Sequence, residues 1–260
     1  MEQAEPPTPT PGPAGLEASR KAPSTKAPAA AAWGRRFLIA VVIVLVVVVA
    51  FYAGRRLIMG PDHFTIEHTR PVVSHVDGMS YRVHEGHVGP DKAADTLAII
   101  NGRVIDVMRH LRARYTRGSD GDAYPARREA VARLLARYNP DNLAENSPKD
   151  PSGDTSYTLD KGAVVALCLR ERDPTTIGDP RVHDIHDLDT LMFVTLHEMG
   201  HIAIDDIDHP PRFWSAFRFL LEAAEEAGVY TSADYAARPR SYCGVRIDYN
   251  PRYDPGTPPI

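Results

Sequence analysis

Residues 188–204 read LDTLMFVTLHEMGHIAI, and this stretch decides the fold of the chain. Its apolar side chains recur at helical spacing, at Leu188, Leu191, Met192 and Met199. Asp187 stands directly before the first turn, where its carboxylate can accept hydrogen bonds from free backbone N–H groups. We therefore predict a helix over residues 188–204 that packs against a core.

The motif inside this helix, His197-Glu198-Met199-Gly200-His201, combines residues that can bind a metal and move a proton. Residues four apart lie on one face of a helix, so both imidazoles can reach a single metal ion. Glu198 lies beside them, where its carboxylate can take a proton from a metal-bound water. The spacing predicts a metal site with His197 and His201 as ligands and Glu198 as the general base.

A catalytic zinc site needs a third protein ligand and keeps its fourth position for water. His209 comes eight residues after His201, just past the predicted helix, and Pro210-Pro211 stiffen the turn that follows it. Glu222, on the next predicted helix, is the alternative third ligand, because another class of zinc peptidase takes a glutamate from the following helix. We predict His209 as the third ligand and Zn2+ as the metal.

The rest of the chain alternates between short strands and amphipathic helices. Strand-like segments at 64–83 flank a turn at 76–78, and a hairpin turns at Asp160-Lys161-Gly162. Helical periodicity marks three further segments, at 91–115, 126–138 and 212–227. This order predicts an α+β, zincin-like domain over residues 57–250, built from a small sheet, the motif-bearing helix and supporting helices, with a loose tail at 251–260.

The N-terminal part differs sharply in composition. Residues 1–34 are rich in proline and alanine, which predicts a disordered tail. Residues 37–54, FLIAVVIVLVVVVAFYAG, are uninterruptedly apolar, and as a helix they would span about 27 Å, close to the roughly 30 Å hydrocarbon core of a bilayer. Arginine pairs flank the run. We predict a transmembrane anchor at 35–56 and a single-pass membrane protein whose N-terminus is cytosolic, because more basic residues precede the run than follow it.

The charge of the remaining chain limits its partners. Residues 57–260 hold 23 basic and 31 acidic side chains, a net charge of −8. Such a surface repels nucleic acid, so we expect none as a partner. A protein or peptide substrate is expected from the motif at residues 197–201 and not from the charge. The two cysteines, Cys168 and Cys243, exclude a disulfide-rich scaffold or a four-cysteine zinc site. They could pair in an oxidising compartment, but we favour two buried, unpaired side chains.

Several further motifs support a resemblance to a known family. HEMGH followed by His209 and Phe213-Trp214 resembles the core of the WLM and SprT-like zinc metallopeptidases. With Thr155-Ser-Tyr-Thr, Cys168-Leu-Arg170 and Tyr242-Cys-Gly added, residues 64–250 look most like a group of predicted WLM-like metallopeptidases known largely from large DNA viruses and some of their hosts. The resemblance implies zinc bound by the three histidines, with Glu198 as the catalytic base.

These features predict a membrane-anchored zinc metallopeptidase that hydrolyses peptide bonds. Tyr242 could stabilise the oxyanion of the tetrahedral intermediate, although packing beside Cys243 is the interpretation we favour. Two alternatives stay open: a membrane protein or peptide-binding scaffold in which zinc only stabilises the fold, and a hydrolase of non-peptide amides that uses the same chemistry.

Overall fold

The computed structural model describes residues 68–116, 119–146, 155–170 and 185–260, together with five residues between positions 39 and 46. The chain divides between Pro61 and Asp62 into two units, and all the helices and strands named below belong to the second.

One five-stranded sheet forms the base of this unit. Its strands follow the order β1 (Thr69–Val73), β2 (Ser80–His84), β3 (Leu143–Glu145), β5 (Val164–Leu167) and β4 (Tyr157–Leu159). The two outer pairs, β1–β2 and β5–β4, are antiparallel hairpins, whereas β2–β3 and β3–β5 are parallel. The sheet is therefore mixed, and the predicted α+β class is confirmed.

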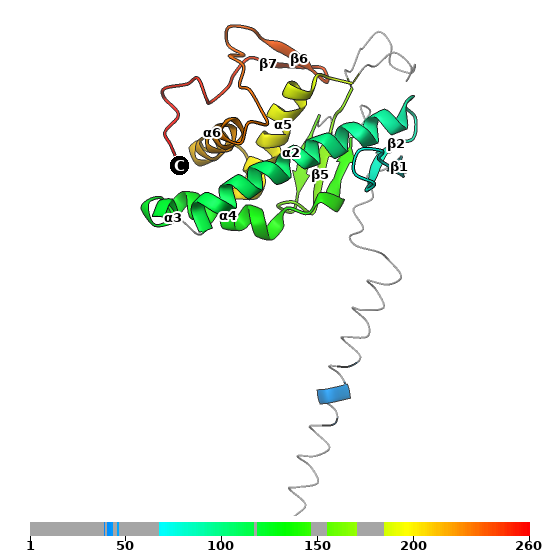
Figure 1. The fold of residues 1–260 in the computed structure, drawn as a ribbon, viewed down its shortest axis with the longest axis horizontal. Helices are drawn as coiled ribbons and strands as arrows, with labels where there is room; N and C mark the ends of the chain where they lie inside the picture. The colour runs from blue at the N-terminus through cyan, green and yellow to red at the C-terminus, as the bar shows by residue number, and fades with distance from the viewer. Residues whose placement is uncertain are drawn as a thin grey trace, which may run out of the picture. The chain divides into compact units, whose positions relative to one another are not determined.

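The helices are α2 (Pro90–Thr116), α3 (Ser119–Ala123), α4 (Pro125–Arg137), the 3-10 turn η1 (Pro140–Asn142), α5 (Leu188–Ala203) and α6 (Pro211–Glu226). Helices α2 and α5 pack on this sheet, and further helices pack against these two. The long helix α2 runs across the sheet and contacts β1, β2 and β3 (Figure 1). Helix α5 contacts β4 and β5, and α4 and α6 pack against it. The motif-bearing helix is thus enclosed by other elements, as its apolar sequence predicts.

The core follows from the alternation of side chains along the strands. In β5 all four residues are buried, because both faces of this inner strand are covered. Val165 and Leu167 join the main core beneath the helices, whereas Val164 and Ala166 pack with Tyr157 in a smaller cluster. The predicted hairpin around residues 160–162 is confirmed as β4 and β5. The strand at the sheet edge beside α5 is therefore positioned by a neighbour that is close in sequence.

The predicted membrane anchor needs correction. In the described part of the chain, no helix has both the length and the apolar character needed to cross a membrane. A span takes about 20 consecutive apolar helical residues, and only five positions of the predicted 35–56 anchor are described, all helical. The rest of that range, like residues 1–34, lies outside the described residues. The predicted transmembrane helix, membrane contact through 37–54 and single-pass localisation are therefore not supported.

The two cysteines also differ from the favoured prediction. Cys168 and Cys243 form a disulfide that ties the end of β5 to the turn between β6 (Arg240–Tyr242) and β7 (Val245–Ile247). Both residues are buried, as expected, but 75 positions separate them. Their proximity depends on the tertiary fold, which residue types alone do not disclose.

The C-terminal residues lie against α6. The guanidinium of Arg218 donates hydrogen bonds to the carbonyl oxygens of Asp254 and Thr257, at 3.2 and 2.6 Å. The hydroxyl of Tyr253 donates to the carbonyl oxygen of Ser232 at 2.9 Å. Residues 251–260, expected to be loose because of their prolines, are therefore hydrogen-bonded to the domain.

Candidate metal centre

Helix α5 presents two of the predicted ligands. Asp187 caps its N-terminus as predicted, with its carboxylate accepting hydrogen bonds from the backbone N–H and the hydroxyl of Thr190. Three turns further along the helix, His197 and His201 project to the same side, with ring centroids 5.1 Å apart. The four-residue spacing thus has the geometric consequence that the sequence predicts.

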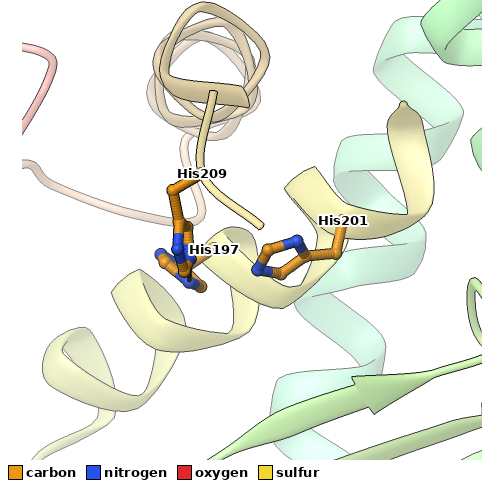
Figure 2. A group of neighbouring side chains, drawn as sticks. All are labelled: His197, His201 and His209. Carbon is orange, nitrogen blue, oxygen red and sulfur yellow. Dashed lines mark hydrogen bonds between the residues drawn. The ribbon is translucent and has the colours of Figure 1, made fainter. Parts of the chain in front are cut away.

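His209 reaches the same point from the loop between α5 and α6. Asp208 adopts a left-handed backbone conformation, with φ of 61°, and turns the chain back towards α5. Pro210 occupies the position before α6 and Pro211 begins the helix, so the loop ends directly after His209. The Nε2 atoms of His209 and His197 lie 3.0 Å apart. Figure 2 shows the three imidazoles gathered between α5 and the start of α6.

Charged side chains fasten the loop that carries His209. Arg137 of α4 donates to the carbonyl oxygen of Ile202 at 3.2 Å and to the carboxylate of Asp205 at 2.6 Å. Arg133 lies 2.9 Å from the other oxygen of Asp205. From the β4–β5 turn, the Lys161 ammonium donates to the carbonyl oxygen of Asp206 at 2.5 Å. The aspartates of this loop therefore anchor its backbone to α4 and the sheet.

Aromatic rings form the floor of the site. Phe213 stacks on His201 with ring centroids 4.4 Å apart and an angle of 28° between the planes. Trp214 stacks on His209 at 5.6 Å and 30°. A Cβ atom at Gly200 would lie only 3.0 Å from the ring of Phe213, so glycine at this position lets α6 approach α5. These contacts limit rotation of the imidazoles.

The three imidazoles are held in their neutral form. Burial, followed by the neighbouring His201 and His209, lowers the pKa of His197 to about 3. Burial, followed by His209 and then Lys161, lowers the pKa of His201 to about 4. Burial also lowers the pKa of His209. A metal ion is bound by neutral imidazole, so no proton needs to be removed from these rings near pH 7.

These three histidines could hold a metal ion. Their potential ligand atoms all lie within 4.8 Å of one another. Among the described residues, this is the group of potential metal ligands that lies so close together. Glu222, the alternative third ligand, instead accepts a hydrogen bond from the Arg218 guanidinium at 3.1 Å on α6. The geometry favours His209 over Glu222.

Glu198 is buried directly beside the histidines, with 4% of its surface exposed. Its Oε2 atom accepts a hydrogen bond of 2.9 Å from the hydroxyl of Thr158 on β4. Thr158 ends the Thr155-Ser-Tyr-Thr motif, for which the sequence predicts no role in the site. No sequence signal identifies this contact, because it depends on β4 lying beside the motif-bearing helix in the folded chain.

Tyr242 lies at the disulfide. Its ring is buried, and its hydroxyl donates to the carbonyl oxygen of Cys168 at 2.8 Å and lies 2.6 Å from the hydroxyl of Ser156. The ring of His186 packs against it at 5.0 Å. These contacts give Tyr242 a packing position beside Cys243, and its role towards an oxyanion stays a prediction.

Comparison with known proteins shows relatives in viruses. The chain is 33% identical over 177 residues to "Uncharacterized protein R325" of Acanthamoeba polyphaga mimivirus, which covers 68% of this chain and 81% of the viral protein. The chain belongs to the R325 family. A further relative, "Uncharacterized protein 042R" of Invertebrate iridescent virus 3, is 30% identical over 146 residues and is covered to 83%.

A further relative comes from a second iridescent virus. "Uncharacterized protein 136R" of Invertebrate iridescent virus 6 is 30% identical over 103 residues, 53% of its length. No protein-family model matches the chain, and no solved structure matches it. Neither of these two comparisons gives an activity or a ligand for this member of the R325 family.

Proposed function

We propose that the protein is a zinc-dependent metallopeptidase related to the WLM and SprT-like enzymes. The observation that carries this proposal is the convergence of three imidazoles beside a buried glutamate. Three protein ligands leave a fourth position for water or substrate, the arrangement typical of catalytic rather than structural zinc sites. Glu198, next in sequence to a ligand, supplies a base at that position.

The donor set fits zinc. Imidazole nitrogen suits this metal, and a Zn–N bond of about 2.0–2.1 Å in a tetrahedron places ligand nitrogens about 3.3–3.4 Å apart. The 3.0 Å between the Nε2 atoms of His197 and His209 is close to this value. The potential ligand atoms of all three histidines lie within 4.8 Å of one another, so His201 would complete the ligand set.

The chemistry of the chain's own residues follows from this arrangement. When bound, zinc supplies Lewis-acid chemistry that lowers the pKa of a water molecule and polarises a carbonyl group. Glu198 would accept a proton from the attacking water and donate it to the leaving amine. Since the carboxylate is buried, its interaction with the developing charges is stronger than it would be in bulk water.

A peptide substrate is supported by the position of β4. In the part of the sheet that the structure describes, β4 is an edge strand, with β5 as its neighbour on one side. An extended peptide can add to such an edge through main-chain hydrogen bonds. The same strand carries Thr158, whose hydroxyl contacts Glu198, so a peptide paired with β4 would pass close to the base.

The test is the Glu198→Gln variant of the full chain, compared with the unsubstituted protein on a broad peptide library. We expect the variant to retain one zinc per chain and to lose hydrolysis by at least about 100-fold, since the amide cannot act as a base. Glu222→Gln is the matched control, and it should retain both zinc and activity. Retained turnover in Glu198→Gln would refute the assignment of the base.

Other outcomes would favour the alternatives. Bound zinc without cleavage of any peptide in the library would support a non-catalytic, zinc-stabilised protein or a peptide-binding scaffold. Turnover confined to small non-peptide amides would retain the chemistry but change the substrate class.

A further inference from the structure

We propose that Thr158 is the positioning residue for Glu198, and that a hydrogen-bonded ring around Ser156, braced by the disulfide, holds Thr158 in place. This inference rests on the proposed function, because it assigns a role to a residue that acts through the base. It gives a function to the Thr155-Ser-Tyr-Thr and Tyr242-Cys-Gly motifs, which the metal site leaves unexplained.

The contact itself joins two elements far apart in sequence. The Oγ1 atom of Thr158 on β4 lies 2.9 Å from Oε2 of Glu198 on α5, and 3.4 Å from the backbone carbonyl oxygen of the same residue. A hydroxyl donates one hydrogen, and the shorter distance favours the carboxylate as its acceptor. This bond restricts the rotation of a glutamate side chain that would otherwise have several rotamers.

Threonine on a strand is well suited to this task. Its branched Cβ restricts χ1, so the direction of the hydroxyl is set largely by the backbone. That backbone is fixed because Thr158 pairs with Val165 of β5, an inner strand of the sheet. The Glu198 carboxylate is therefore held in position by the sheet, through Thr158, as well as by its own helix.

A closed ring of hydrogen bonds fixes the chain two residues before Thr158. The hydroxyl of Ser156 accepts from the backbone N–H of Cys168 at 2.9 Å and lies 2.6 Å from the hydroxyl of Tyr242. The Tyr242 hydroxyl donates to the carbonyl oxygen of Cys168 at 2.8 Å. Because that hydrogen is used, Ser156 is the donor towards Tyr242, and the ring closes with each hydroxyl donating once.

The disulfide keeps this ring together. It joins Cys168, which supplies two backbone groups of the ring, to Cys243, the residue that follows Tyr242. Tyr242 and both cysteines are buried. The β6–β7 turn thus stays beside the end of β5 while the disulfide is intact. Ser156, two residues before Thr158, is then held by Cys168 at the end of β5 and by Tyr242 beside the turn.

The experiment uses two substitutions at Thr158 in the zinc-loaded full chain. Thr158→Val keeps the shape of the side chain and removes the hydroxyl, whereas Thr158→Ser keeps the hydroxyl. Thr195→Val on α5 is the matched control, because its buried hydroxyl donates to the carbonyl oxygen of Leu191 and not to the base. Each chain is measured with the fluorogenic peptide that the unsubstituted protein cleaves fastest.

We expect Thr158→Val to lower kcat by about tenfold or more, with KM within about twofold and zinc content unchanged. Thr158→Ser should keep kcat within about threefold of the unsubstituted chain, as should Thr195→Val. Crystal structures of the metal-free variants provide a readout that needs no turnover. In Thr158→Val the Glu198 carboxylate should turn away from β4, and in Thr158→Ser it should accept the serine hydroxyl.

The failures of the two proposals are distinguishable. If the unsubstituted chain cleaves the peptide and Glu198→Gln does not, but Thr158→Val keeps full kcat, the positioning role is overturned and the proposed function stands. If no chain cleaves any peptide, the proposed function fails. An unmoved Glu198 carboxylate in the Thr158→Val crystal would overturn the positioning role regardless of activity.

Discussion

The Nε2 atom of His209 lies 3.0 Å from that of His197, although twelve residues and the end of a helix separate them. The backbone of the intervening loop explains this approach, since Asp208 turns it in the left-handed region and Pro210 occupies the position before the next helix. The third imidazole is therefore delivered by the loop, and α6 keeps Glu222 paired with Arg218.

The first prediction concerns the third metal ligand, His209 or Glu222. His209→Ala should weaken zinc binding by more than about 100-fold, because it removes a ligand rather than a residue that only orients one. Glu222→Ala should leave zinc stoichiometry and affinity unchanged. Competition with a chromogenic chelator measures both, and loss of zinc only in the Glu222 variant would show that the third ligand lies on α6.

The second prediction concerns the packing of α5 on α6. A methyl group at Gly200 would lie 3.0 Å from the ring of Phe213, which in turn stacks on His201. Gly200→Ala should therefore lower the free energy of unfolding by about 1–3 kcal/mol and weaken zinc binding through the displaced imidazole. Urea unfolding of the metal-free chain and chelator competition measure the two effects.

Gly102 on α2 provides the control for this substitution. It is exposed, and a Cβ atom there would meet nothing within 4 Å. Gly102→Ala should raise the free energy of unfolding by up to about 1 kcal/mol, because alanine is the better helix former. Equal effects of the two substitutions would contradict the close contact between Gly200 and Phe213.

The site was predictable from sequence where it depends on local geometry. The four-residue spacing of His197 and His201 has a fixed meaning on a helix, and the Pro210-Pro211 turn favours the return of His209. The contact of Thr158 with Glu198 spans 40 positions. It depends on which strand lies at the sheet edge beside α5, and a sequence pattern does not supply that information.

The fold shows the same division. The hairpin β4–β5 and the helices α2, α4, α5 and α6 follow from periodicity and turn residues, and the structure has them within a few positions. The strand β3 has three residues, too few for a period, yet it forms both parallel pairings of the sheet. The apolar run at 37–54 predicted a membrane span that the described residues do not support.

The third prediction is a pH dependence of the metal-free protein. His201 has a pKa of about 4 in the folded chain and an ordinary value of 6.5 when unfolded. Between these values the unfolded chain binds the proton and the folded chain does not, so stability is full above about pH 6.5 and falls as the pH drops towards 4. His197, with its pKa lowered to about 3, acts in the same direction.

Substitution isolates this contribution from the other titrating groups. The free energy of unfolding of the metal-free chain, measured in urea at pH 7 and pH 5, should fall less in His201→Asn than in the unsubstituted protein. The opposite order would mean that the His201 imidazole is charged in the folded state.

The fourth prediction concerns the disulfide between Cys168 and Cys243. The bond closes a loop of 75 residues, and in the chain-entropy description a loop of that length stabilises the folded state by about 4 kcal/mol. The double variant Cys168→Ala, Cys243→Ala should lose about that amount of unfolding free energy in urea unfolding of the metal-free chain.

The unsubstituted chain in excess reductant should unfold at a similar urea concentration, because reduction removes the same constraint. If reduction leaves the midpoint unchanged while the double variant is destabilised, the loss comes from packing of the sulfur atoms, and the disulfide does not restrain the turn that carries Tyr242.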